Sequence, residues 1–480
     1  MGKDMQRRDF LKAAGFAAAA LAVPGYAQTP SRSAKGRKPA LRLAGKPNIV
    51  YFTIDELGYF ELSCMGNKYH KTPNIDRLAA EGMRFTQALA GGPVCAPTRC
   101  VLMTGQHTGH CTVRKNSQVW PMRAEDVTVA EVLKKAGYAT GGFGKWGCGD
   151  SGTTGAPELH GFDIFFGYYN QTHAHSYFPN YLVRNGEKVP LEGNTGDFHT
   201  GKQFSQYLIF DESVKFIRQN KDRPFFCYCA WTPPHGQWGI PEDEPAWQEF
   251  KDKPWTVKGG SARDAKVYAA MVAMVDRQVG QILALLKELG IEDNTIVFFS
   301  GDNGGKRYFG DFFEPNRDFR GEKGNLYEGG LRIPMIVRWP RRIKAGAVSD
   351  FLWYFPDVMP TLAELAGASA PANIDGISIV PTLLGEAAAG RTQQKHEFLY
   401  WEHLQQVTVR MGNYKAIQPA KNKPFELYDL SKDVGEQNNI ADKFPDILAK
   451  MKAFAEQSHT ENLIGEVLDK EKAWKGHEFR

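Results

Sequence analysis

Hydrophobic and polar residues along most of this chain follow two alternating patterns. Short, almost uninterrupted apolar runs predict buried strands over residues 49–54, 138–143, 225–232 and 295–300. Longer segments, in which apolar residues recur every three or four positions, predict helices over residues 74–81, 125–136, 203–219 and 264–289. Strands that alternate with helices are typical of an α/β fold with a large, mostly parallel central sheet flanked by helices.

A different pattern begins near residue 390. Short strands with only turns between them are predicted there, before a final helix, over residues 398–401, 407–411, 414–417, 425–430 and 444–456. Strands joined by turns pair as antiparallel neighbours. We therefore expect a large domain over residues 47–390 and a small C-terminal α+β subdomain, containing an antiparallel sheet, over residues 391–480.

Polar residues directly follow four of the predicted strands. Ligands of open α/β sheets bind outside the carboxyl ends of the strands, so these polar positions should share one rim of the sheet. They are Asp55 and Glu56, Lys145, His235, and Asp302 and Asn303. The sequence therefore predicts a functional site at this rim.

The formal net charge of +5 comes from the N-terminal part of the chain. Residues 1–46 carry a net charge of +8, so the remaining residues carry −3. A surface that binds nucleic acid needs clustered cations on the folded domain itself. The charge distribution therefore excludes nucleic acid as a partner, and a composition of 42% hydrophobic and 24% charged residues is typical of a soluble globular protein.

Residues 1–27 have the pattern of an export signal. Arg7 and Arg8 precede Asp-Phe-Leu-Lys, an apolar run over 13–23 and a small-residue end, which together resemble a bacterial twin-arginine (Tat) signal peptide. The alternative is a buried or frayed N-terminal helix. We expect residues 28–46 to be a basic flexible tether and the Tat export machinery to be a partner. The mature protein should then be periplasmic or extracellular, without a stable membrane span.

Cys95 lies in the most informative stretch of the chain. Residues 93–105 read Pro-Val-Cys-Ala-Pro-Thr-Arg-Cys-Val-Leu-Met-Thr-Gly, which resembles the signature of the sulfatase family. The resemblance extends over nearly the whole mature chain. It implies an alkaline-phosphatase-like fold, conversion of Cys95 to formylglycine by a maturase, and hydrolysis of sulfated carbohydrates or aryl sulfates. The seven cysteines form no C-x-x-C pair, which argues against a zinc site or a disulfide scaffold.

The residues around Cys95 favour an anion at this position. Pro97 fits the first turn of a helix, where its missing N–H costs nothing, so Cys95 should lie at a helix N-terminus. Unpaired N–H groups and the helix dipole favour a negatively charged ligand there, and a sulfate ester is one. Arg99 follows one turn later and offers a planar fork of donors for a sulfate oxygen or for the modified side chain.

The resemblance also implies a set of metal ligands. They are Asp55, Glu56, Asp302 and Asn303, together with Cys95 after its conversion. The hard oxygen atoms of these side chains suit Ca²⁺ or Mg²⁺. The family usually has Asp at the second of these positions, where this chain has Glu56, which is longer by one methylene group.

Two lysines and a histidine match further functional positions of the family. Lys145, within Gly-Lys-Trp, and Lys323, within residues 320–330, correspond to lysines that contact sulfate, and His235 corresponds to a histidine near the leaving-group oxygen. The family commonly has His directly after Gly-Lys-Trp. This chain has Gly147 there, so a hydrogen-bond partner for the formylglycine hydroxyl is either absent or supplied by another residue.

The resemblance implies an in-line mechanism. One hydroxyl of hydrated formylglycine, polarised by the cation, would attack sulfur, and His235 or Lys323 would protonate the leaving alcohol. The second hydroxyl would then lose its proton as the aldehyde reforms and sulfate leaves. The cation and the side chains of Arg99, Lys145 and Lys323 would stabilise the sulfuryl oxygens in the transition state.

The substrate and the reaction class leave alternatives open. Residues 168–179 resemble a segment of bacterial arylsulfatase-like carbohydrate sulfatases, which predicts that His173 and His175 contact a sugar hydroxyl; the alternative is two surface histidines in a tyrosine-rich loop. One rival function is that of a phosphodiesterase or phosphonate monoester hydrolase of the same superfamily. The other is a catalytically silent glycan-binding protein, which Gly147 and Glu56 make conceivable.

Overall fold

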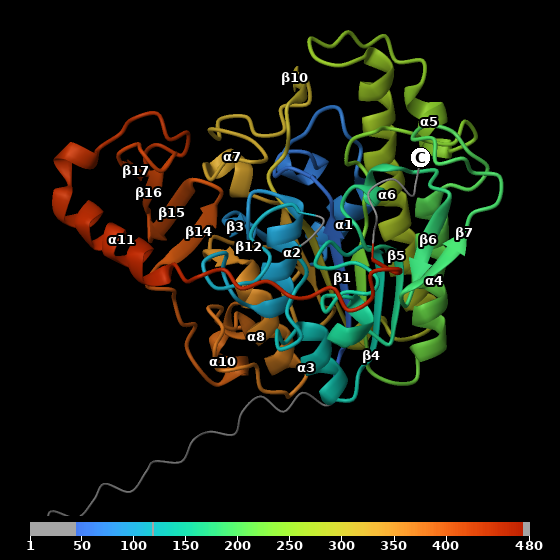
Figure 1. The fold of residues 1–480 in the computed structure, drawn as a ribbon, viewed down its shortest axis with the longest axis horizontal. Helices are drawn as coiled ribbons and strands as arrows, with labels where there is room; N and C mark the ends of the chain where they lie inside the picture. The colour runs from blue at the N-terminus through green and yellow to red at the C-terminus, as the bar shows by residue number, and fades with distance from the viewer. Residues whose placement is uncertain (1–44, 118–119, 474–480) are drawn as a thin grey trace, which may run out of the picture. The chain divides into compact units, whose positions relative to one another are not determined.

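The computed structural model describes residues 45–117 and 120–473. The predicted signal peptide, residues 1–27, and all but the last two residues of the predicted tether lie outside this part of the chain. Within it, the predicted fold class is confirmed: a large sheet is flanked by helices, and a separate antiparallel sheet follows (Figure 1).

The central sheet has ten strands. Five neighbouring strands in its middle, β9, β1, β8, β4 and β5, run parallel to one another, while β11, β6 and β7 pair antiparallel. The sheet is therefore mixed, with a parallel centre. In spatial order its strands are β12 (Ala347–Ser349), β2 (Met83–Phe85), β11 (Met335–Arg338), β9 (Thr295–Gly301), β1 (Asn48–Ile54), β8 (Phe225–Ala230), β4 (Ala139–Lys145), β5 (Ile164–Tyr168), β6 (Tyr181–Arg184) and β7 (Glu187–Pro190).

Strand β1 shows why the apolar runs of the sequence are almost uninterrupted. All seven of its residues are buried, because β8 and β9 pair with its two edges and helices cover both faces. Successive side chains point to opposite faces of a strand. Phe52 and Ile54 accordingly belong to one hydrophobic core, and Ile49 and Tyr51 to the other. A strand buried on both faces needs apolar residues at every position.

Two groups of helices cover the faces of the sheet (Figure 1). One core includes residues of α1 (Pro73–Ala80), α4 (Ser205–Asn220), α5 (Pro245–Phe250) and α6 (Ala262–Glu288). The other includes residues of α2 (Cys95–Thr104), α3 (Val129–Lys135), α8 (Val358–Leu365) and α9 (Val380–Leu384). Further elements are β3 (Ala88–Leu89), β13 (Trp353–Tyr354), β10 (Tyr308–Asp311), α7 (Glu328–Leu331) and α10 (Glu386–Ala389).

Helix α3 begins four residues later than the periodicity predicted. Thr128 is its N-cap: the Thr128 hydroxyl accepts a hydrogen bond from the backbone N–H of Glu131, and the Glu131 carboxylate accepts one from the backbone N–H of Thr128. This reciprocal capping box satisfies N–H groups that a helix start leaves unpaired. The capping geometry, rather than the apolar period, therefore decides where the helix begins.

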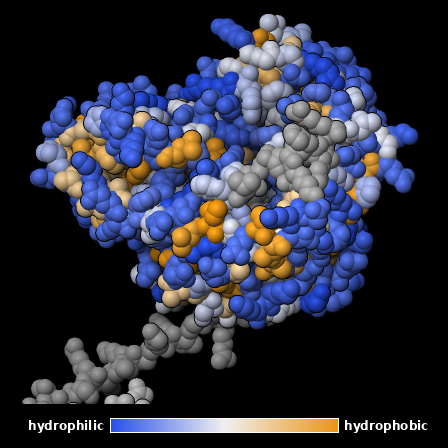
Figure 2. Space-filling model, in the orientation of Figure 1, coloured by the Kyte–Doolittle hydropathy of each residue, from blue (hydrophilic) through white to orange (hydrophobic). Residues whose placement is uncertain are grey.

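Helix α6 is the one helix in the described chain that is long and apolar enough to cross a membrane by composition. However, 78% of its most apolar window is buried inside the fold, as is usual for a core helix. The face of the molecule in Figure 2 is mostly hydrophilic, with scattered hydrophobic areas.

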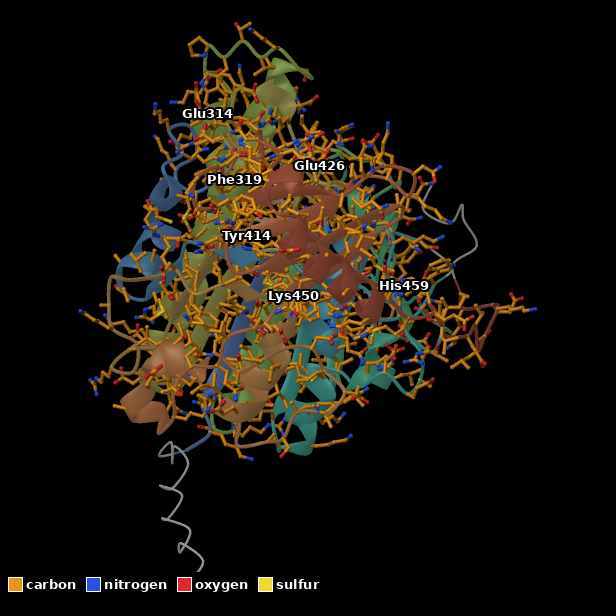
Figure 3. All side chains as sticks on the ribbon, turned by 90° about the vertical axis from the view of Figure 1, so that its left-hand side faces the viewer. Glu314, Phe319, Tyr414, Glu426, Lys450 and His459 are labelled. Atoms are coloured by element: carbon orange, nitrogen blue, oxygen red, sulfur yellow. The ribbon has the colours of Figure 1, made fainter. Side chains whose placement is uncertain are left out.

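The C-terminal part forms the predicted antiparallel sheet. Its strands, in order, are β14 (Leu399–His403), β15 (Gln406–Met411), β16 (Tyr414–Gln418) and β17 (Glu426–Asp429). Helix α11 (Pro445–Ser458) packs on this sheet, and Met451 and Phe454 join its core. Figure 3 views this part from its outer side, with Tyr414, Glu426 and Lys450 labelled on β16, β17 and α11.

A buried group of charged residues joins the C-terminal sheet to helix α7 and the residue that follows it. Nζ of Lys415, on β16, lies 3.0 Å from Oε1 of Glu328 and 2.9 Å from Oε1 of Glu436. Arg332 also forms an ion pair with Glu328. Burial alone would raise the pKa of Glu328, but the neighbouring positive charges of Lys415, Arg332 and Arg410 hold this pKa well below its usual range. The two parts are thus linked by charges that have no access to water.

Candidate active site

The register of the central strands places two acidic residues side by side. Ile54 of β1 lies opposite Gly301 of β9, so the residues that follow them, Asp55 and Asp302, leave the sheet together. The backbone N–H of Asp302 donates to the carbonyl oxygen of Ile54 (3.1 Å), and that of Glu56 donates to Oδ1 of Asp302 (2.9 Å). These contacts lie at the carboxyl ends of parallel strands, where α/β sheets bind their ligands.

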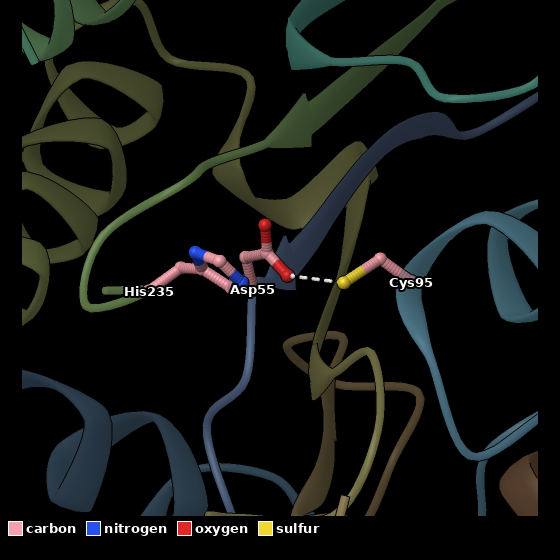
Figure 4. A group of neighbouring side chains, drawn as sticks. All are labelled: Asp55, Cys95 and His235. Carbon is pink, nitrogen blue, oxygen red and sulfur yellow. Dashed lines mark hydrogen bonds between the residues drawn. The ribbon is translucent and has the colours of Figure 1, made fainter. Parts of the chain in front are cut away.

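Cys95 is the first residue of helix α2 and points at this pair of acids. Its Sγ donates to Oδ1 of Asp55 at 3.2 Å, and Figure 4 shows Cys95 and His235 on either side of Asp55. Burial and the charge of Asp55 raise the pKa of the Cys95 thiol to about 12. The hydroxyl of Thr98, one turn into the helix, donates to the carbonyl oxygen of Asp302 (2.7 Å) and so ties the helix to the rim.

Two buried cations neutralise the two acids. Nζ of Lys145, the last residue of β4, lies 2.6 Å from Oδ2 of Asp55, and a guanidinium nitrogen of Arg99 lies 2.9 Å from Oδ2 of Asp302. Burial alone would raise the Asp55 pKa, but the charges of Lys145 and Arg99 hold it well below its usual range. Burial and the Asp55 charge raise the pKa of Asp302 to about 7.

Glu56, Lys323 and His235 form a second group beside the first. Nζ of Lys323 lies 2.9 Å from both Oε2 of Glu56 and Nε2 of His235, and the Tyr308 hydroxyl donates to the same Glu56 oxygen (3.0 Å). Burial and the Lys323 charge hold the pKa of His235 well below its usual range. Although burial opposes it, the anionic neighbours of Lys323 raise its pKa. Glu56 has a φ of 63°, a strained backbone conformation that is typical of functional sites.

The oxygen atoms of this rim fit a hard divalent cation. Oε1 of Glu56 and Oδ1 of Asn303 are buried and have no hydrogen-bond partner within the described residues. A buried oxygen without a donor is costly, because its desolvation is not compensated. Both atoms belong to residues that adjoin Asp55 and Asp302, so together they offer the all-oxygen environment that Ca²⁺ and Mg²⁺ prefer. Asp55, Cys95 and His235 also bring one potential ligand atom each within 4.8 Å of one another.

The two histidines predicted to contact substrate have different surroundings. His173 is buried, and its Nε2 donates to the carbonyl oxygen of Tyr181 (3.0 Å). His175 stacks on the His235 ring at 4.6 Å between centroids. It also lines a cavity of about 420 Å³ that reaches His235, together with His199, Trp238, Asp264 and Tyr308. The structure thus brings His175 to the site and leaves His173 inside the fold.

Three residues near the site could not be identified from the sequence. Tyr308 holds Glu56, as described above. Gln406, on β15, binds the backbone of the loop that carries Lys323: its Oε1 accepts from Leu326 N–H (3.1 Å) and its Nε2 donates to the Gly324 carbonyl oxygen (3.1 Å). Gln171 lies inside the segment 168–179, where only the two histidines were predicted to contact substrate.

Comparison with solved structures defines the class of the fold. The crystal structure of Ps i-CgsB in complex with k-i-k-neocarrahexaose is 28% identical, with a TM-score of 0.73 over 86% of this chain and 93% of that chain. The PsFucS1 sulfatase from Pseudoalteromonas sp. is 26% identical, with a TM-score of 0.68 over 88% and 92%. The architecture is that of sulfatases within the alkaline-phosphatase superfamily.

Comparison at the level of sequence specifies the family. The family described as Sulfatase matches residues 47–368, and the family described as N-sulphoglucosamine sulphohydrolase, C-terminal, matches residues 321–461. Human arylsulfatase A is 31% identical over 86% of this chain and 87% of its own length. The N-acetylgalactosamine-6-O-sulfatase of Bacteroides thetaiotaomicron is 28% identical over 91% and 98%. This chain belongs to the sulfatase family and is an enzyme, a sulfuric ester hydrolase.

Proposed function

We propose that this enzyme removes sulfate from a sulfated carbohydrate, using a nucleophile made from Cys95 and a bound divalent cation. The observation that carries the proposal is the buried contact between Cys95 and Asp55, whose second carboxylate oxygen is held by Lys145. A thiol with a raised pKa is a poor nucleophile in this setting. Its chemical conversion to an oxygen nucleophile would therefore give this position a function that the thiol lacks.

The side chains of the rim divide into two functional sets. Asp55, Glu56, Asp302 and Asn303 would hold Ca²⁺ or Mg²⁺, since they present buried oxygens that include two without a donor. Formylglycine at position 95, with the cation, would supply a polarised hydroxyl group for attack on sulfur.

The positively charged set would bind the sulfate group. Arg99 and Lys145 pair with Asp302 and Asp55, and Lys323 pairs with the neighbouring Glu56. Charges fixed in a water-excluded site stabilise an anionic transition state without reorganisation. His235 lies 3.1 Å from Glu56 and also lines the cavity that His175 lines. The leaving alcohol would have to depart through this cavity. We assign His235, or Lys323, the protonation of that alcohol.

A carbohydrate substrate is supported by the relatives and by the cavity. The Bacteroides relative is named for a sulfated amino sugar, and the Ps i-CgsB structure holds an oligosaccharide. The cavity beside His235 combines Trp238 and Tyr308 with polar groups of His175, His199 and Asp264. Aromatic faces with a few placed polar groups are a usual lining of small-molecule sites.

Export and maturation are further parts of the proposal. The twin-arginine pattern of residues 1–27 supports Tat-dependent export to the periplasm or beyond, with a basic tether over residues 28–46. A maturase would act on the signature around Cys95 before export. The proposed catalytic domain spans residues 47–390 and the C-terminal subdomain residues 391–480.

One experiment tests the central claim. The full chain, expressed with a formylglycine-generating maturase, is assayed on nitrophenyl sulfate, phosphate and phosphonate esters and on a panel of sulfated oligosaccharides. Mass spectrometry of the peptide that contains residue 95 is done on the same sample. Sulfate release together with an aldehyde at position 95 supports the proposal. An unmodified thiol with no sulfate release overturns it, and faster turnover of phosphate or phosphonate esters assigns the site to phosphoryl transfer.

A further inference from the structure

The side chain of Gln171 occupies the space into which any side chain at position 147 would project. Gly147 has a φ of 85°, and a Cβ atom added to it would lie 1.8 Å from Nε2 of Gln171 and 3.6 Å from Cδ of Arg99. The Gln171 carboxamide and the Arg99 side chain therefore border the same space. Glycine at position 147 is what makes room for it.

Strand pairing holds Gln171 in this place. Lys145 of β4 lies opposite Tyr168 of β5 in a parallel register. Beyond the strand ends, the backbone N–H of Trp146 donates to the Tyr168 carbonyl oxygen (2.8 Å) and that of Gly147 donates to the Tyr169 carbonyl oxygen (3.1 Å). The chain from 169 to 171 thus follows the chain from 145 to 147 to the head of helix α2.

Two buried hydrogen-bond donors that border this space lack an acceptor. Gln171 is 8% exposed, and neither its Nε2 nor the Nε of Arg99 has a partner among the residues that the structure describes. Leaving a buried donor unpaired is costly, because its desolvation is not compensated. Two unpaired donors that border one space indicate that an acceptor belongs in that space.

Position 95 is the place for that acceptor. Cys95 and Arg99 are four residues apart on α2, so their side chains lie on the same face of the helix. The sulfur of a cysteine is a weak acceptor, whereas a hydroxyl oxygen accepts readily. An oxygen-bearing side chain at position 95 would satisfy donors that the thiol leaves unpaired.

We propose that Gln171 is a catalytic residue that donates a hydrogen bond from Nε2 to a hydroxyl oxygen of hydrated formylglycine at position 95. The inference rests on the proposed function, because it requires an oxygen at this position. A carboxamide does not titrate, so it neither takes nor supplies a proton. Its effect is to stabilise the hydrate and to orient its hydroxyl groups.

The test replaces the donor without changing the shape of the side chain. Gln171→Met and Gln171→Glu keep nearly the volume of glutamine but have no N–H group. The matched control is Gln206→Met, because Gln206 is also buried and donates to Gln278, away from the rim. Each protein is first compared with the wild type by thermal melting. If Gln171→Met does not fold, the measurements are made on Gln171→Glu.

Two measurements follow on the folded variants. We expect kcat on a sulfate ester to fall at least tenfold in the Gln171 variants, with KM nearly unchanged and the Gln206 variant unaffected. We also expect hydroxylamine to form the oxime at residue 95 several-fold faster, since loss of the hydrogen bond shifts the hydrate toward the aldehyde. This second readout does not depend on turnover.

The outcomes separate this inference from the function on which it rests. A wild-type protein whose Cys95 is unmodified and that releases no sulfate overturns both. A wild type that is modified and active, with Gln171 variants that match it in kcat and in oxime formation, overturns the role of Gln171 alone.

Discussion

Sγ of Cys95 lies 3.2 Å from Oδ1 of Asp55, although 40 positions separate the two residues in the chain. One begins helix α2 and the other follows the central strand β1. The contact therefore joins Cys95, the cysteine of the family signature, to the rim of the sheet where buried acidic and basic side chains meet. The proposed function requires this arrangement, with a reactive group at position 95 next to a cation site.

Replacing Cys95 should abolish catalysis without unfolding the protein. Cys95→Ala is expected to lower kcat for sulfate release by at least about a thousandfold, because the nucleophile is lost. Cys100→Ala is the matched control, since Cys100 lies on the same helix and is buried in its core. It should cost about 1 kcal/mol of stability and keep activity. Full activity of Cys95→Ala would rule out this nucleophile.

Removal of divalent cations should inactivate and destabilise the enzyme. Ca²⁺ or Mg²⁺ at a hundred times its dissociation constant stabilises a folded protein by about 2.7 kcal/mol, which calorimetry detects as a higher melting temperature. Asn303→Ala should reduce this shift, because it removes one of the unpaired oxygens. Asn67→Ala, at a buried asparagine that binds the Phe60 carbonyl oxygen, should lower stability but keep the shift. A melting temperature indifferent to both cations contradicts the site.

His173 and His175 should give opposite results when replaced. His175→Ala is expected to raise KM several-fold at unchanged stability, because this ring lines the cavity beside His235. His173→Gln is expected to leave KM alone and to cost about 1–3 kcal/mol, because glutamine lacks the ring that packs against Tyr168 and Tyr181. Steady-state kinetics and denaturant titration separate the two effects. A raised KM in His173→Gln would return that residue to the substrate site.

His173→Gln should also change how the free energy of unfolding depends on pH. Burial lowers the pKa of His173 to about 3, from 6.5 in an unfolded chain. Between these values the unfolded state binds the proton and the folded state does not, so the free energy of unfolding falls as pH drops from about 6.5 toward 3. The contribution is at most roughly 5 kcal/mol. Stability measured against pH should therefore be flatter over this range in His173→Gln than in the wild type.

Loss of Lys415 should destabilise the junction between the two sheets. Lys415→Met leaves Glu328 and Glu436 as buried acids without their shared cation, at an expected cost of about 3–5 kcal/mol. The exposed pair of Lys450 and Glu397 provides the control, since Lys450→Met should cost less than about 1 kcal/mol. Equal costs for the two variants would contradict the importance of burial.

This junction also has a defined dependence on pH. The positive neighbours of Glu328 hold its pKa below the usual value of 4.5 despite burial. The stability that this group contributes is thus present above about pH 4.5 and is lost as the pH falls further. Lys415→Met removes part of that attraction, so the Glu328 contribution should change less with acid in the variant. Denaturant titrations at several pH values measure this difference.

Gln406 should influence catalysis from outside the site. Its side chain binds the backbone at Gly324 and Leu326, directly after Lys323 in the same loop. Gln406→Ala should lower kcat/KM several-fold, because Lys323 would be held less rigidly, while thermal melting changes little. Gln437→Ala, at an exposed glutamine of the same subdomain, is the control. An unchanged kcat/KM would show that the loop needs no support from β15.

Local patterns in the sequence were sufficient to predict most of the fold. Strand β1 could be recognised because burial on both faces requires apolar residues throughout, and α6 because its apolar residues recur with the helical period. Both signals depend only on near neighbours in the chain. The start of α3 was misplaced for the same reason, since a cap is decided by side-chain hydrogen bonds rather than by the period.

The sequence by itself determined the family, the order of the elements and the candidate residues, because a motif such as residues 93–105 can be read without knowing what surrounds it. Tertiary structure alone decided which candidates meet. His173 and His175 are two positions apart, yet one ring bonds to Tyr181 and the other stacks on His235. Gln171 fills the space beside Gly147 only because β4 and β5 pair in register and position 147 has no side chain. Side-chain direction and register arise from packing between distant segments, and no local pattern records them.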